Sequence, residues 1–207
     1  MSELERIELL DGLILGDGGI YGKYPRFQMN VSAKSRQWII RIRNEFKLHN
    51  IRCHITPIDK RGLNQLLSER NEFFTEQLAR WYPRGIKVVP NDVCISARSI
   101  AFWFEGDGST AIYSGSQRGS PNQVRIVLCT DSFTKNDVEF LGKRLTEVVG
   151  ISKFNLINRG NGQHRISIDL NNDVFLFIDY IDGFVKYPFR YKIKRPSKLR
   201  RSHSDDN

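Results

Sequence analysis

The sequence predicts an α+β fold made of two similar halves, and three observations lead to this prediction. A glycine-flanked aspartate follows an apolar helical segment twice, at Asp17 and at Asp107. The order helix, strands, helix, hairpin, helix occurs twice, with the changeover near residues 89–93. The strands alternate apolar and polar residues. A repeat of this length indicates two halves packed about a pseudo-twofold axis. We expect an N-terminal half over residues 1–92, a C-terminal half over 93–195 and a basic, frayed tail over 196–207.

In the first half, apolar residues at helical spacing predict a helix over residues 4–15, ended by Gly16-Asp17-Gly18-Gly19. Alternation of Phe27, Met29 and Val31 with polar residues predicts a two-faced strand over residues 25–32. The other elements expected in this half are a helix over residues 35–48, strands over 51–59 and 63–70, and a helix over 71–82.

The second half repeats this order. A helix from about Ser96 runs to the second Gly-Asp-Gly, and a loop rich in Ser and Gly over residues 113–123 leads to a strand over 124–130. Thr134 and Gly150 are expected to cap the next helix. The remaining elements are that helix over residues 134–150, a hairpin over 154–170 that turns at Asn161-Gly162, and a helix over 172–182.

The charge balance points to a polyanionic partner. The chain of 207 residues has a net charge of +9 and a pI of about 9.6, which favours nucleic acid over a membrane. No apolar run approaches the ~20 residues of a spanning helix, so we expect no membrane association. The N-terminus does not resemble a signal peptide. The three cysteines lack disulfide or zinc spacing, which predicts an intracellular location: the cytoplasm or nucleoid, or an organelle matrix or stroma.

Small residues predict that the two helices that precede the aspartates pack closely. Gly12 and Gly16 are four apart on one helix face, and Ala97 and Ala101 have the same spacing in the second helix. If the C-terminal ends of the two helices meet, the two aspartates arrive side by side. Such a carboxylate pair would repel itself unless it held hard cations such as Mg²⁺. The alternative is that each Gly-Asp-Gly is only a turn with a solvated aspartate, and its duplication argues against this.

Two segments then resemble a known family. Leu10 to Gly18, LDGLILGDG, and Ile100 to Gly108, IAFWFEGDG, resemble the signature of the LAGLIDADG homing endonucleases in their single-chain, two-motif form. Residues 87–93, 128–141 and 187–194 are similar to segments of the branch that includes intron-encoded enzymes, so the resemblance covers residues 4–195. The motif positions that depart from the signature are Asp11, Leu15, Phe102 and Glu105. These departures concern helix packing, since the aspartate position is intact in both copies.

The resemblance implies a monomer of two αββαββα halves, with the motif helices at the interface and two antiparallel sheets forming a saddle over double-stranded DNA. It implies that Asp17 with the Gly16 carbonyl, and Asp107 with the Gly106 carbonyl, bind Mg²⁺ or Mn²⁺, with two or three ions in all. It further implies hydrolysis of both strands of a long target by a metal-activated water, leaving short 3′ overhangs.

A lysine in each half is expected near the metals, because phosphodiester cleavage needs cations that order water and offset charge. The positions that match those of the family are Lys87 and Lys192. Lys34 is a rival in the first half, because it resembles a lysine of other members. The alternative for each is a surface lysine or a phosphate contact.

Polar faces of the predicted strands supply the candidate DNA contacts, because Arg, Gln and Asn pair with base edges in the major groove. A half-solvated sheet shows the same alternation, and the basic charge and the resemblance favour the DNA interpretation. His54 is expected to contact a base or phosphate and not a metal. The tail over residues 194–201 is expected to contact phosphates. The candidates are Arg26, Gln28, Asn30, Ser32, Lys34, Arg52, His54, Thr56, Gln123, Arg125, Arg165 and Ser167.

Three functions fit this sequence. The first is a site-specific DNA endonuclease that spreads an intron or a similar element. The second is a maturase on the same fold, which would bind its host intron RNA and assist splicing. The third is a regulator that kept the fold and lost cleavage, for which loss of an aspartate would be the sign; both aspartates are present.

Overall fold

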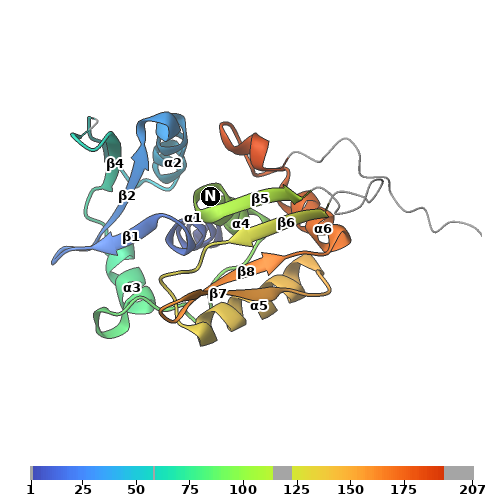
Figure 1. Cartoon of the computed structure of the whole chain (residues 1–207). Helices are drawn as coiled ribbons and strands as arrows, with labels where there is room; N and C mark the ends of the chain where they lie inside the picture. Colours follow the sequence, from blue (N-terminus) through green and yellow to red (C-terminus); the bar gives the residue numbers. More distant parts are fainter. Residues whose placement is uncertain (1, 58, 114–122, 194–207) are drawn as a thin grey trace, which may run out of the picture.

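The computed structural model describes residues 2–57, 59–113 and 123–193, which form two halves of the same design (Figure 1). Each half is a four-stranded antiparallel sheet with helices packed on one face, which confirms the predicted α+β class. The strand orders, β1-β2-β4-β3 and β5-β6-β8-β7, are equivalent.

The elements have the following bounds. In the first half they are α1 Glu3–Leu15, β1 Gly18–Tyr21, β2 Arg26–Ser32, the 3-10 helix η1 Ala33–Ser35, α2 Arg36–Leu48, β3 Cys53–Ile55, β4 Leu63–Ser68, α3 Glu72–Trp81 and η2 Pro83–Gly85. In the second half they are α4 Ala97–Asp107, β5 Gly108–Tyr113, β6 Gln123–Leu128, α5 Lys135–Val149, β7 Asn155–Gly160, β8 Gln163–Ile168, α6 Asn171–Ile181 and η3 Phe189–Ile193.

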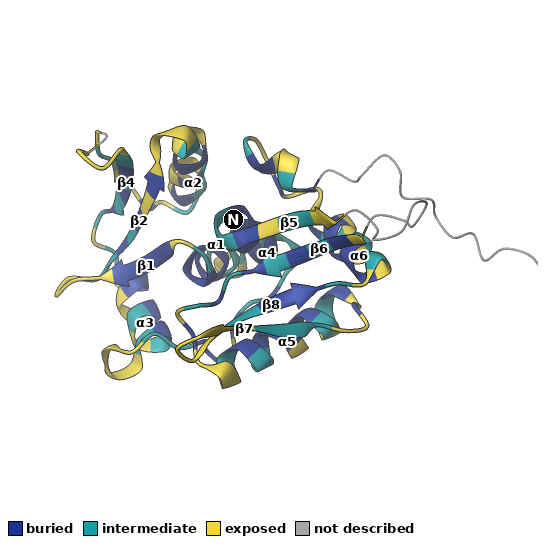
Figure 2. Ribbon diagram, in the orientation of Figure 1, coloured by how far each residue is buried: buried dark blue, intermediate teal, exposed yellow. Residues whose placement is uncertain are grey.

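The two motif helices lie at the centre of the molecule. A capping box begins each helix, formed by Ser2 and Glu5 in α1 and by Ser96 and Ser99 in α4. After its first turns each helix is buried on every side, from Leu9 in α1 and from Ser99 in α4 (Figure 2). A helix that is apolar all round is one that is buried all round, so the core continues from one half into the other.

Gly12 allows the two helices to touch, as the sequence predicts. A Cβ at Gly12 would overlap the Ser99 carbonyl oxygen and lie 2.8 Å from Ser99 Cα. No side chain can occupy this position without moving one helix. The α4 backbone nearest to Gly12 is that of Ser99, and Trp103 is the α4 residue whose carbonyl lies nearest to Gly16. The prediction that Ala97 and Ala101 form this contact is therefore wrong, although Ala101 is fully buried.

A strand begins within three residues of the end of each motif helix, which the residue pattern did not predict. The expected turn at Gly18 is the start of β1, and Gly108 likewise begins β5. Both positions need glycine because of close packing: a Cβ at Gly18 would lie 2.7 Å from the Phe27 ring, and one at Gly108 would lie 2.6 Å from the Phe104 carbonyl oxygen. The missing side chain removes the alternation by which strands are recognised.

Other local predictions are confirmed. The hairpin between β7 and β8 turns at Asn161 and Gly162, whose φ angles of 51° and 75° suit a tight two-residue connection. Thr134 caps α5 by accepting from the Asp137 amide, and Gly150 ends it in the left-handed conformation. The loop residues 114–122 and the predicted tail contacts over 194–201 lie outside the described residues, as does the frayed end.

Two of the four motif departures, Asp11 and Glu105, are buried carboxylates with several hydrogen-bond donors around them. Asp11 accepts two bonds from Arg80, at 2.6 and 2.9 Å, and further bonds from Trp81 Nε1 and the Cys94 amide. Glu105 accepts from Trp38 Nε1 at 2.9 Å, Arg41 Nη1 at 2.6 Å and the Lys186 amide at 2.8 Å. Because Trp38 and Arg41 belong to α2, Glu105 ties the second motif helix to the first half.

Within the described ranges, no helix has the length and apolarity needed to cross a bilayer.

Replacing Gly12 by alanine should destabilise the protein, because the new methyl group would force the two helix backbones apart. Overpacking of this kind costs about 1–3 kcal/mol, measurable by urea unfolding. Gly183→Ala is the matched control, since no atom lies within 4 Å of a Cβ there. Equal stability of the two variants would contradict the close approach.

Arg41→Met should destabilise by about 3 kcal/mol or more, because it leaves the fully buried Glu105 without its cation. Adding Glu105→Leu, the residue type at the equivalent position Leu15, should recover part of the loss. Arg144→Met removes an exposed pair with Glu147 and should cost under about 1 kcal/mol. Thermal unfolding of the variants measures this, and a loss for Arg41→Met no larger than for Arg144→Met would refute the role of the pair.

Candidate active site

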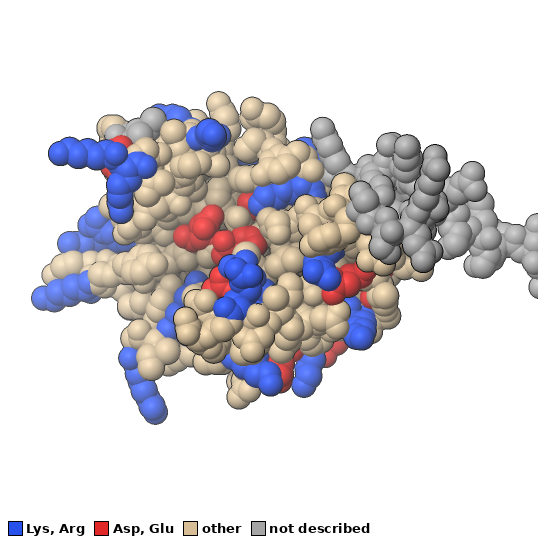
Figure 3. Space-filling model, in the orientation of Figure 1, with Lys and Arg blue, Asp and Glu red and all other residues tan. Residues whose placement is uncertain are grey.

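The C-terminal ends of α1 and α4 meet and bring the two Gly-Asp-Gly segments together. A Cβ at Gly106 would lie 3.3 Å from Asp17 Oδ2, and a Cβ at Gly16 would lie 3.8 Å from Gly106 Cα. Asp107 follows Gly106 directly, so the carboxylates of the two halves face one region between the sheets. Carboxylates gather at the centre of this face in Figure 3, with Lys and Arg side chains around them.

Both aspartates have a raised pKa. Loss of solvation between the halves, together with repulsion by Asp17, raises the pKa of Asp107 to about 6. The same loss of solvation raises the pKa of Asp17, although this residue keeps contact with solvent. The cationic side chains of Lys87 and Lys192 oppose both shifts without cancelling them. The two carboxylates would therefore be stabilised further by a bound cation, because the lysines offset only part of the pKa shifts.

The two lysines occupy equivalent positions. Lys87 Nζ donates to the Ile14 carbonyl at 2.7 Å, and Lys192 Nζ donates to the carbonyls of Phe104 and Glu105 at 3.1 and 2.8 Å. Each lysine thus neutralises the negative end of one motif helix. Burial lowers the pKa of Lys87 to about 8 and also lowers that of Lys192, while the aspartates act in the opposite direction.

Lys34 lies elsewhere. It is an exposed residue of η1, which follows β2 directly. Lys87, and not Lys34, is the lysine of the first half whose charge lowers the pKa of both aspartates. Its catalytic role, like that of Lys192, stays a prediction.

The residues present fit a magnesium-type ion. No group of three or more His, Cys, Asp or Glu side chains suited to a metal occurs in the part of the chain that the structure describes, which argues against an all-protein cage. Mg²⁺ is instead bound by one or two carboxylates together with waters and substrate phosphates. Two mutually repelling carboxylates, with the Gly16 and Gly106 backbones beside them, match that donor set.

The first sheet presents most of the predicted DNA contacts on its outer face. Arg26, Gln28, Asn30 and Ser32 alternate along β2 with buried apolar residues. The others are already engaged within the protein. Glu69 accepts from Arg52 at 3.0 Å and lies 3.3 Å from His54 Nε2. The Thr56 hydroxyl bonds to the backbone of Gln65.

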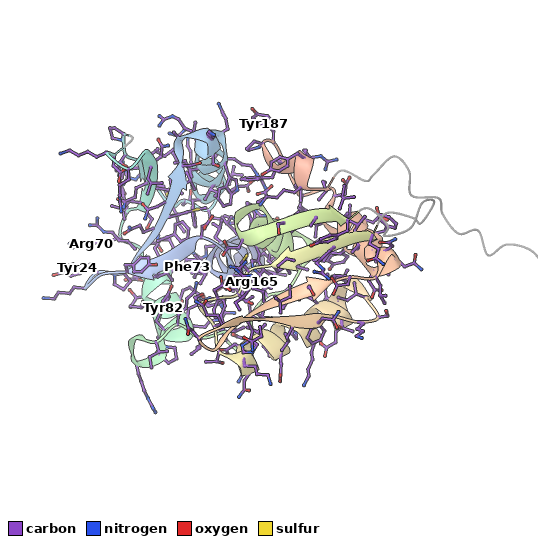
Figure 4. All side chains as sticks on the ribbon, viewed as in Figure 1. Tyr24, Arg70, Phe73, Tyr82, Arg165 and Tyr187 are labelled. Carbon is purple, nitrogen blue, oxygen red and sulfur yellow. The ribbon has the colours of Figure 1, made fainter. Side chains whose placement is uncertain are left out.

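The second sheet differs from the first in that the arginines on its outer face form ion pairs with aspartates. Gln123 is exposed as predicted, whereas Arg125 pairs with Asp169 and Arg165 pairs with Asp131. Arg165 lies near the centre of the face in Figure 4. The prediction that Ser167 faces the DNA is wrong. This residue is 1 % exposed, and its hydroxyl donates to Asp169 at 3.0 Å.

Sequence reasoning missed both aspartates. Asp169 continues the period of two set by Arg165 and Ser167, so the alternation alone could have placed it on the outer face. Asp131 follows β6 in a loop, and no periodicity marks it.

Comparisons with known proteins agree with this geometry. The family model described as "LAGLIDADG DNA endonuclease family" matches residues 7–175. A protein of Methanocaldococcus jannaschii named "Uncharacterized protein MJ1098" is 27% identical over 193 residues, which cover 89% of this chain and 72% of that protein.

Solved structures share the fold. The homing endonuclease I-WcaI bound to its DNA recognition sequence is similar with a TM-score of 0.71 and 22% identity, over 93% of this chain and 87% of that chain. The homing endonuclease I-GzeII in complex with its DNA target gives 0.59 and 14%, over 90% and 86%. Full-length DUF199/WhiA from Thermatoga maritima gives 0.55 and 19%, over 87% of this chain and 56% of that chain.

Without metal, Asp107 should make the stability of the protein fall as pH rises. Its pKa is about 6 in the folded state, against 3.8 when unperturbed, so the folded state binds more protons between these values. Stability should therefore decline from about pH 4 to pH 6 and stay lower above it. Asp107→Asn should lack this decline and be the more stable protein at pH 7.5. Urea unfolding in EDTA measures both, and parallel pH profiles would contradict the shift.

Proposed function

The chain belongs to the LAGLIDADG DNA endonuclease family, and we propose that it is a site-specific endonuclease that acts as a monomer on a long double-stranded DNA target. It would hydrolyse one phosphodiester in each strand with the help of divalent metal ions, leaving short 3′ overhangs. The observation that carries this proposal is the meeting of Asp17 and Asp107 at the ends of two packed helices, each with a lysine on the adjacent carbonyls.

We assign metal binding to the two aspartates and charge stabilisation to the two lysines. Asp17 and Asp107, with the carbonyl oxygens of Gly16 and Gly106, would hold Mg²⁺ or Mn²⁺ against the scissile phosphates. When bound, the metal supplies an activated water and charge stabilisation at the phosphate. Lys87 and Lys192 place a cation beside each carboxylate, where they offset the negative charge that builds up on the phosphate during attack.

The outer faces of the two sheets would bind the duplex on either side of this centre. The basic charge of +9 supports such binding, because each phosphate neutralised by Lys or Arg releases counterions. Solved relatives with the same fold are bound to DNA. The polar residues of β2 and the arginines of β6 and β8 are the candidates for contacts with base edges.

The other two functions predict different behaviour. A maturase would bind its host intron RNA and speed splicing whether or not it cuts DNA. A regulator would bind DNA without cutting it, and retention of both aspartates disfavours it.

Cleavage of plasmid DNA that carries the uninterrupted host locus tests the proposal. We expect Mg²⁺-dependent cutting of both strands, lowered by about a hundredfold or more in Asp17→Asn and in Asp107→Asn, because each removes a metal ligand. Lys87→Met and Lys192→Met should each lower the rate constant on bound DNA by about a hundredfold. Undiminished cutting by either aspartate variant would refute the site.

Lys34→Met is the matched lysine control. It should weaken DNA binding while leaving the rate constant of bound DNA unchanged, because Lys34 is exposed and is not among the charges that shift the pKa of either aspartate. Splicing of the host intron RNA, measured with the same preparations, separates the maturase function: stimulation of splicing by a protein that cuts no DNA would favour it.

A further inference from the structure

Asp169 gathers side chains from three strands of the second sheet. It follows β8, and its carboxylate accepts from Arg125 Nε on β6, from Asn155 Nδ2 on β7 at 2.7 Å and from Ser167 Oγ on β8 at 3.0 Å. Burial alone would raise the pKa of Asp169, but the hydrogen bonds from Asn155, Ser167 and Arg125 hold it below its usual value. The aspartate is thus a fixed anion within the sheet surface.

Arg125 is held on two sides. Its Nε donates to Asp169, and its guanidinium carbon lies 5.3 Å from the centroid of the Tyr113 ring on the neighbouring strand β5. Arginine has five N–H donors in a rigid fork. Fixing Nε therefore sets the orientation of the plane, with the terminal nitrogens beyond the contact. The side chain stays 39 % exposed on the outer face of the sheet.

Such an arginine suits guanine. The terminal nitrogens of a guanidinium match the O6 and N7 acceptors that guanine presents in the major groove. A free arginine loses side-chain entropy when it makes this pair, whereas an arginine already fixed by a carboxylate loses less. Because Asp169 fixes the Arg125 side chain in one orientation, we expect the arginine to contact a base at one position of the target and not to contact phosphates along the duplex.

Arg165 is arranged differently, and we do not assign it a base. Its Nε donates to Asp131 Oδ1 at 2.8 Å and its Nη2 donates to Asp131 Oδ2. This pair uses one whole edge of the fork. Arg125 bonds its aspartate through Nε alone, so neither terminal nitrogen is bonded to Asp169, and the neighbouring protein group on that side is the Tyr113 side chain.

We propose that Arg125 recognises a guanine in the half of the target covered by β5–β8, and that Asp169 is the positioning residue that makes this recognition specific. The inference rests on the proposed function, since it requires that the sheet binds duplex DNA.

Selection of bound duplexes from a randomised library tests the proposal, with Asp17→Asn present in every protein to prevent cutting. The base preference at each position is compared among the parent protein, Arg125→Lys, Asp169→Asn and Ser167→Ala. Asp182→Asn is the matched control, because it removes the same charge from an exposed pair with Arg190 outside the sheet. Thermal midpoints measured in parallel identify any variant that fails to fold.

We expect Arg125→Lys to lower the preference for guanine at one position by about fivefold to a hundredfold, with the other positions unchanged. Asp169→Asn should lower the preference at the same position, whereas Ser167→Ala and Asp182→Asn should leave it intact.

An even loss across all positions in Asp169→Asn would mean a structural role and would overturn the positioning assignment. A selected site whose guanines are indifferent to Arg125→Lys would overturn the recognition itself and leave the endonuclease proposal standing. A parent protein that selects no sequence at all would overturn both.

Discussion

Close contact between two helix backbones is the constraint on which the rest of this molecule depends. Where Gly12 meets Ser99, no atom separates the helices, and this contact fixes where their C-terminal ends lie. The aspartates, the lysines on the adjacent carbonyls and the first strand of each sheet all start from those ends. Small residues at a helix interface therefore decide the position of chemistry that lies more than a turn away.

The meeting of the two helix ends places ionisable groups where their charged forms are destabilised. Two carboxylates with raised pKa values face each other, and burial lowers the pKa of both neighbouring lysines. Two other carboxylates near the helix interface differ in their hydrogen bonding. Asp11 and Glu105 are fully buried, but every one of their oxygens accepts a hydrogen bond from Arg, Trp or the backbone. Satisfied carboxylates support the helices, and unsatisfied ones mark the place where a cation belongs.

The sequence predicted those features that leave a local or periodic signal. The motif helices, the alternating face of β2, the caps of α5 and the Asn161-Gly162 turn all carry one. The residue pattern did not predict β1 and β5, because each begins with a glycine that tertiary packing requires and a pattern of side chains cannot record; only the family resemblance implied a strand there. The ion pairs of Asp131 and Asp169 were also missed, since each joins segments far apart in the chain. Ser167 has the right parity for an outer-face residue, and only its neighbours reveal that it is covered.

The outer faces of the two sheets carry different chemistry. β2 offers an arginine, two amides and a serine, of which Asn30 accepts from Gln65 and Ser32 contacts Ser35, whereas β6 and β8 offer arginines fixed by carboxylates. Both faces belong to one polypeptide, so the two sheets can carry different residues on either side of a single helix contact. A duplex complementary to both faces would have unlike arms: the target would be no palindrome, and the protein would sit on it in a single direction.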